Sequence, residues 1–236
     1  MNYVENYQYG TVVANAAADE RADFIRKAYL HLTGAVVAFA VIVTYLVQSD
    51  LAARIAVALF SNKYGVLIVM LAFVGISWIA NSWAMSATSK AMQYAGLGLY
   101  TVAEAVIMCP LIYIAHKHFP GTVPAAAVIS LAMFGGLTFI VFITGKDFSF
   151  LRGILWLGGL IALGLIVCSL IFGFQLGIAF TVAMIGLCCG YILYDTSNVI
   201  HHYRVGQHVA AGLALFASVA LLFWYVLRLL MALKRE

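Results

Sequence analysis

One long apolar segment of this chain ends in a polar cluster, at Gly190-Tyr191-Ile192-Leu193-Tyr194-Asp195-Thr196-Ser197-Asn198-Val199-Ile200-His201-His202. A carboxylate, two hydroxyls and an amide follow one another there, in a chain of which only 9% is charged. The apolar residues before them are numerous enough to cross a membrane as a helix. The polar cluster therefore marks the end of a predicted membrane helix and the first place to look for function.

The composition of the whole chain supports this prediction. The 236 residues are 65% hydrophobic and have a mean hydropathy of +1.02, whereas soluble proteins are roughly 45 to 50% apolar. We interpret the chain as an integral membrane protein whose first partner is the lipid bilayer. Its formal charge of +4 is spread thinly over 13 basic and 9 acidic residues, without the basic stripe of a nucleic-acid-binding protein. Nucleic acid is excluded as a partner.

Seven stretches are long enough to span the hydrocarbon core of a bilayer, which takes about twenty helical residues. The sequences between them are short, and short connections join antiparallel neighbours in a compact bundle. The prediction is an all-α polytopic protein with a single bundle of seven transmembrane helices. The predicted spans cover approximately residues 28–47, 65–84, 92–115, 124–144, 152–173, 176–198 and 209–231.

The segment before the first span has a different character. Residues 1–24 lack apolar periodicity, so we predict a polar aqueous tail followed by the transmembrane domain at 25–236. No signal-peptide pattern is present, and the first helix itself is expected to direct insertion. An odd number of spans places the two termini on opposite faces. The distribution of lysine and arginine between the connections favours a cytoplasmic N-terminus.

Three ionisable side chains within the predicted spans need an explanation, because each costs roughly 2.5 to 3.5 kcal/mol to insert at the centre of a membrane helix. Glu104 lies mid-span and is either a neutral or hydrogen-bonded structural acid or part of an ion pathway. Arg228 either reaches the membrane interface with its long side chain or pairs with Glu104. Asp195 lies near a helix C-terminus, where the helix dipole disfavours an acid. A purely structural role at the helix end therefore explains Asp195 poorly.

Other chemistry finds little support in the sequence. A metal site that combines Asp195 with the histidines at 201, 202 and 208 is conceivable, but adjacent histidines in a loop are more often simply solvated, and we predict no metal. No catalytic nucleophile motif and no phosphate-binding glycine loop is present. We therefore predict that the protein is not an enzyme and has no cofactor.

The residues Ile192-Leu193-Tyr194-Asp195-Thr196-Ser197-Asn198-Val199-Ile200-His201 resemble the signature of the Bax inhibitor-1 family, particularly its bacterial YccA-like branch. Two further stretches, Phe24-Ile25-Arg26-Lys27-Ala28-Tyr29 and Gly145-Lys146-Asp147-Phe148-Ser149-Phe150-Leu151, resemble the same family. Together with the hydropathy pattern, the resemblance covers residues 24 to 233.

The resemblance implies a bundle in which six helices enclose a central one and the sixth and seventh helices carry paired aspartates. In calcium-leak members the two acids share protons and gate a pore according to pH. Asp195 matches the first aspartate and Arg228 matches an arginine late in the last helix, but Ser218 stands where the second aspartate is expected. A serine hydroxyl can donate to Asp195, so pH sensing should be simpler and weaker than in a paired site.

Two functions follow from the resemblance. The first is modulation of a membrane-bound ATP-dependent protease, the role of YccA-like members, in the inner membrane of a bacterium. The alternative is a pH-sensitive leak for calcium or another cation, in which Asp195, Glu104, Ser218 and Arg228 would form the pathway and Ca²⁺ would be the permeant ion. The serine at position 218 favours the first.

Overall fold

The protein forms a bundle of helices in a computed structural model that describes residues 10–61, 64–87 and 89–234. Within these residues the structure contains one short 3-10 helix, η1, and eight α-helices, and its only β-pairing is an isolated bridge. The elements are η1 (Val13–Asn15), α1 (Ala18–Gln48), α2 (Asp50–Phe60), α3 (Gly65–Ala84), α4 (Lys90–His118), α5 (Thr122–Thr144), α6 (Leu151–Phe172), α7 (Ile178–His201) and α8 (His208–Leu233).

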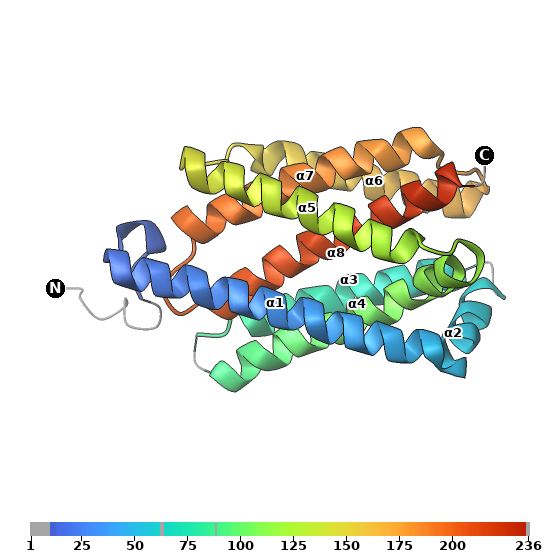
Figure 1. Ribbon diagram of the computed structural model, residues 1–236, viewed down its shortest axis with the longest axis horizontal. Helices are drawn as coiled ribbons and strands as arrows, with labels where there is room; N and C mark the ends of the chain where they lie inside the picture. Colours follow the sequence, from blue (N-terminus) through green and yellow to red (C-terminus); the bar gives the residue numbers. More distant parts are fainter. Residues whose placement is uncertain (1–9, 62–63, 88, 235–236) are drawn as a thin grey trace.

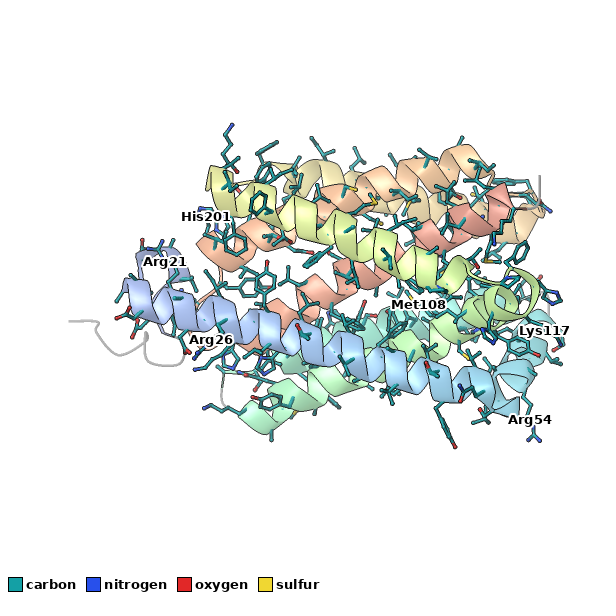
Figure 2. The ribbon with its side chains drawn as sticks, viewed as in Figure 1. Arg21, Arg26, Arg54, Met108, Lys117 and His201 are labelled. Carbon is teal, nitrogen blue, oxygen red and sulfur yellow. The ribbon has the colours of Figure 1, made fainter. Side chains whose placement is uncertain are left out.

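Seven of the helices are long and apolar enough to cross a membrane. They are α1 and α3 to α8, one for each predicted span, so the prediction of an all-α polytopic membrane protein is confirmed. Figure 2 places Arg21, Arg26 and His201 at one end of the bundle and Arg54 and Lys117 at the other, with Met108 between them. Charged groups at both ends of an apolar body suit a protein that spans a bilayer.

Helix α8 lies in the middle of the bundle (Figure 1). In its most apolar stretch 78% of the residues are buried, against 6% for α3 and 11% for α6. It packs against α1, α3, α4, α5 and α7, whereas α6 packs on α7 and α3 mainly on α4. A helix that is apolar on all sides is expected to be enclosed by protein or lipid. Here protein encloses α8, and α3 and α6 face the lipid.

Successive spanning helices run in opposite directions (Figure 1). Helix α1 begins at the end of the bundle where α7 ends, and α8 finishes at the opposite end. The short connections between antiparallel neighbours produce this arrangement. The end where α7 stops and α8 starts, which we call the α7–α8 end, carries the polar cluster around Asp195.

The N-terminal segment differs from the predicted tail. Helix α1 begins at Ala18, so residues 18–24 are helical, and Val13 is fully buried. The backbone of Val12 forms a bridge with Arg204, and the Val13 amide donates to the Tyr203 carbonyl at 2.9 Å. Residues 10–16 are therefore docked on the turn between α7 and α8. Residues 1–9 of the predicted tail lie outside the described part of the chain.

Helix α2 was not predicted. Its 11 residues are too few to span a bilayer, and we treated them as part of a connection. Asp50 and Arg54 lie among alanine, valine, leucine and isoleucine, which is the composition of a helix with one polar and one apolar side. Figure 1 shows α2 at the end of the bundle where α1 stops, and it packs on α1, α3 and α4.

The contact between α3 and α4 depends on one glycine. A Cβ atom on Gly96 would lie 2.5 Å from the Ala80 carbonyl oxygen and 2.6 Å from the Ala84 backbone nitrogen. No other residue fits at that distance, since small residues are what lets helix backbones approach closely in a membrane. Gly96 thereby sets the position of α4, the helix that carries Glu104.

Candidate functional site

Asp195 and Ser218 meet at the interface of α7 and α8, where the Ser218 hydroxyl donates a hydrogen bond to Oδ2 of Asp195. Ser218 is buried in the central helix, and Asp195 is partly buried. The spacing of buried residues on α7 explains why Asp195 points this way. Cys188, Ile192 and Val199 are all fully buried, and residues three or four apart share one face of a helix. Asp195 falls within that face.

Three further hydroxyls gather beside Asp195. The Tyr29 hydroxyl of α1 lies close to the hydroxyls of Thr138 on α5 and Thr196 on α7. All three oxygens are buried, and none of them makes a hydrogen bond of good geometry within the described chain. Buried polar atoms are usually paired. The group is thus a set of three buried hydroxyls without partners among the described residues, one of which belongs to the residue after Asp195.

A polar cavity of about 360 Å³ opens at the α7–α8 end of the bundle. Tyr194 and Asn198, which line it, stand one and three residues from Asp195 on the same helix. A small polar species entering this cavity would therefore come within about one helical turn of Asp195. The lining residues are Met85, Ser149, Arg152, Tyr194, Asn198, His202, Tyr203 and Gln207.

The loop between α5 and α6 is fastened to the end of α7 by Asp147. Its carboxylate accepts hydrogen bonds from the Ser149 amide at 2.8 Å and from the Ser197 hydroxyl at 3.2 Å, and it pairs with His202 at 3.0 Å. These donors, the Ser149 amide first among them, hold the pKa of Asp147 below its ordinary value.

Sequence reasoning missed this contact, although it had singled out the stretch around Asp147 for its resemblance to the family. His202, one of the histidines considered for a metal site with Asp195, pairs with Asp147 instead.

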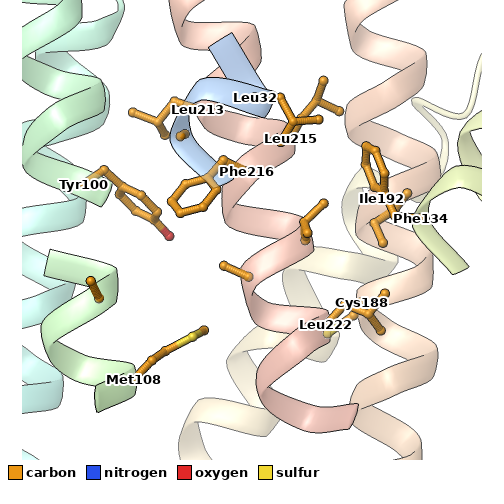
Figure 3. Close-up of a cluster of buried hydrophobic side chains, with 14 of the residues drawn as sticks. Leu32, Tyr100, Met108, Phe134, Cys188, Ile192, Leu213, Leu215, Phe216 and Leu222 are labelled. Carbon is orange, nitrogen blue, oxygen red and sulfur yellow. The ribbon is translucent and has the colours of Figure 1, made fainter. Parts of the chain in front are cut away.

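Glu104 occupies a different environment, on the face of α4 turned toward α8. It is 5% exposed, and its Oε2 atom has no hydrogen-bond partner within the described chain. Tyr100 and Met108 lie one turn before and one turn after it, and Figure 3 shows both among the buried side chains between α4 and α8. The Tyr100 ring contacts Phe216 edge-on at 6.0 Å. Glu104 is thus enclosed by apolar groups.

Arg228 does not pair with Glu104, so that alternative is wrong. Its guanidinium donates to the Leu176 carbonyl oxygen at 2.9 Å, in the connection between α6 and α7. Leu176 lies outside both helices, at the end of the bundle opposite Asp195. Arg228 thus extends toward the end of its helix, as the interfacial interpretation expects. Of the four predicted residues, the structure brings together Asp195 and Ser218 and leaves Glu104 and Arg228 apart.

Comparison with known proteins agrees with this architecture. The family model described as "Inhibitor of apoptosis-promoting Bax1" matches residues 21–235. Protein lifeguard 4 of Mus musculus is 24% identical over 98% of this chain and 94% of its own length. Bax inhibitor 1 of Schizosaccharomyces pombe is 28% identical over 96% of this chain and 83% of its own length.

A plant relative resembles part of the chain more strongly. The BI1-like protein of Arabidopsis thaliana is 38% identical over 114 residues, which cover 44% of this chain and 43% of that protein. The family model, in contrast, spans every membrane helix from α1 to α8. With seven spanning helices around a buried α8 and a match over nearly its whole length, the chain belongs to the Bax inhibitor-1 family of multi-pass membrane proteins.

Proposed function

We propose that this protein conducts a slow, pH-dependent leak of cations, with Ca²⁺ as the candidate ion, through the α7–α8 interface. The observation that carries the proposal is the carboxylate of Asp195, held by the Ser218 hydroxyl of the central helix beside a polar cavity. An ionisable residue inside a membrane bundle is by default a candidate for an ion pathway. A carboxylate oxygen is also the ligand that Ca²⁺ prefers.

A single carboxylate predicts a simple dependence on pH. Protons and cations compete for Asp195, and the neighbouring position offers a hydroxyl that does not titrate in this range. Two coupled acids would release their protons in two linked steps, whereas one acid titrates alone. The flux should therefore change gradually with pH, as a one-proton titration does.

Reconstitution into liposomes tests this proposal. Ca²⁺ entry is followed with an enclosed fluorescent indicator at a series of pH values for the wild type, Asp195→Asn and Ser218→Asp. Asp195→Asn, which keeps the shape of the side chain, should abolish the pH dependence, and Ser218→Asp should make it steeper. Asp23→Asn, which changes a partly exposed acid of α1 that pairs with Arg26 and Lys27, serves as the control. Wild-type flux equal to that of empty liposomes from about pH 5 to pH 8 would refute the proposal.

A second candidate function is modulation of a membrane-bound ATP-dependent protease. One observation favours it: Gly10, Thr11 and Val13 are hydrogen-bonded to the α7–α8 turn, through contacts such as the Gly10 amide to the Val205 carbonyl at 3.2 Å. A protease that grips the residues before Gly10 would pull directly on the turn that follows Asp195. The N-terminal segment would then connect an ATP-driven partner to the candidate site.

Removal of residues 1–9 tests this second function. We expect the shortened protein to be degraded more slowly in cells and to release the protease to act on its other substrates. Unchanged degradation of both would contradict the idea. The predicted location, a bacterial inner membrane with a cytoplasmic N-terminus, is checked by an N-terminal tag, which should be cleaved by protease only after the inner membrane has been opened.

A further inference from the structure

A second cavity lies on the side of the bundle between α1 and α5. It has a volume of about 390 Å³ and is open toward the surroundings of the bundle. Val43 and Phe39 of α1 form one wall, Ala127 of α5 forms the other, and Phe216 and Phe223 of α8 form its floor. Most of its lining is apolar. We call it the lateral groove.

The groove exists because α1 and α5 separate along their length. Near the α7–α8 end the two helices meet through Tyr29 and Phe142, whose ring centroids lie 6.0 Å apart. Toward the other end both helices continue to pack on α8, which is visible between them in Figure 1. The outer faces of the two walls are apolar and exposed, with Val41 at 63% and Val128 at 69%. In a membrane, these faces contact hydrocarbon, and the groove opens into it.

The groove is not uniformly apolar. Gln48 and His116 lie at its outer end, and Ser130 lines its interior. Ser130 is 1% exposed, and its hydroxyl has no hydrogen-bond partner within the described chain. Beyond the outer end, Lys117 approaches the Tyr113 hydroxyl, and Lys234 donates to the Pro120 carbonyl at 2.8 Å. One end of the groove therefore carries positive charge.

We propose that the lateral groove binds one acyl chain of a membrane phospholipid, with the phosphate placed beside His116 and Lys117. The size of the groove falls in the range of ligand pockets, roughly 300 to 1,000 Å³, which are mostly apolar with a few placed polar groups. An apolar trough with a basic end matches the two halves of a phospholipid. The proposal is independent of ion conduction.

Photolabelling in a bilayer tests the proposal. The full-length protein is placed in vesicles of phosphatidylethanolamine and phosphatidylglycerol that contain a small share of phosphatidylcholine with a diazirine near the end of one acyl chain. After illumination, labelled peptides are identified by mass spectrometry. The diagnostic segment is 216–223 of α8, because Phe216, Val219, Ala220 and Phe223 line the groove. Residues 209–213 of α8, which are all buried and do not line the groove, give the background.

Two pairs of variants make the test specific. Ala127→Phe and Ala40→Phe each place a ring in the groove, since both alanines line it. Ala125→Phe and Ala38→Phe put the same ring on exposed positions of the same helices, outside the lining. We expect labelling of segment 216–223 in the wild type and in the two control variants. The two groove variants should lose it, and His116→Ala should reduce it.

Any of three results would overturn the proposal. The first is labelling of segment 216–223 at the background level of segment 209–213 in the wild type. The second is labelling that Ala127→Phe and Ala40→Phe leave unchanged, since lipid would then reach α8 by another route. The third is efficient formation of covalent dimers when cysteines are introduced at positions 40 and 127 and oxidised to disulfides. Such dimers would show that a second copy of the chain fills the groove in place of lipid.

Discussion

Asp195 and Glu104 are two acids that approach the same central helix from different sides, and their surroundings are opposite. Asp195 accepts a hydrogen bond from α8 and stands near three hydroxyls and a polar cavity. Glu104 is enclosed by Tyr100, Met108 and other apolar groups, with one carboxylate oxygen unpaired. Both residues carry the same insertion penalty, but only Asp195 belongs to a helix that lines the polar cavity.

The difference shows that the occurrence of an acid within an apolar stretch of the sequence says little about its function. Asp195 has a hydrogen-bond donor on the central helix and lies on a helix that lines the polar cavity. Glu104 lies mostly among apolar side chains, and its Oε2 atom has no partner within the described chain. We therefore propose that Asp195, on the α7 side of α8, has a functional role and that Glu104, on the α4 side, has a role in packing.

Ser218→Ala should have the largest effect on stability. It removes the donor to Asp195 and leaves a buried carboxylate oxygen unpaired, which costs about 1.5 to 3 kcal/mol for a hydrogen bond to a charged group. The free energy of unfolding in mixed micelles measures the change. Ser169→Ala, which removes only a bond to the Ile166 carbonyl within α6, is the control. Equal effects of the two substitutions would show that the contact between Ser218 and Asp195 is unimportant.

Gly96→Ala should disturb the α4 side and leave the α7 side intact. The added Cβ would lie 2.5 Å from the Ala80 carbonyl oxygen, so α3 and α4 must separate, at about 2 kcal/mol for an overpacked contact. Ca²⁺ flux through the α7–α8 interface should persist at temperatures below the lowered unfolding midpoint. Gly98→Ala meets open space and serves as the matched control. Loss of flux without loss of stability would connect the two sides.

Glu104→Gln should change little. The amide keeps the shape of the side chain and removes a carboxyl group that has an unpaired oxygen, so we expect a change below about 1 kcal/mol, of either sign. The change in unfolding free energy of the double variant with Ser218→Ala should equal the sum of the two single changes to within about 0.5 kcal/mol, as is usual for separate sites. A strong loss of stability or a large coupling would place Glu104 in the same functional site as Asp195.

Asp147→Asn should have the smallest effect, about 0.5 kcal/mol, because the contact with His202 is largely exposed and solvent screens it. The pKa of Asp147 is lowered in the folded protein, so its contribution is present above the ordinary carboxyl pKa and is lost as the pH falls through the lowered value. The difference in unfolding midpoint between wild type and variant should therefore vanish in acid. A difference that grows on acidification would contradict this assignment.

Much of the fold was predictable, because length and hydropathy alone determine which segments can span a bilayer. All seven spans were found on this basis. Helix α2 was missed because its 11 residues resemble a connection when only span length is considered. The start of α1 at Ala18 was missed because its first turns are polar, with Asp19 and Glu20 where the helix dipole favours acids.

The candidate site was predictable only in part. The resemblance to the family put Ser218 opposite Asp195, and the structure shows the hydrogen bond between them. The proposed pairing of Arg228 with Glu104 failed because helical rise estimates depth along the membrane and says nothing about which way a side chain points around the helix axis. The contacts of Asp147 depend on how a loop folds back onto α7, which no periodicity encodes.

The central place of α8 has a consequence for how the protein is made. Helix α8 is the last of the spanning helices to leave the ribosome, yet it occupies the middle of the bundle and carries Ser218. The six spanning helices that are made earlier must therefore stay in the membrane without their central helix until α8 has been synthesised. A nascent chain that ends before His208 has no partner for Asp195 and no interior to close around, which makes it an early substrate for quality control.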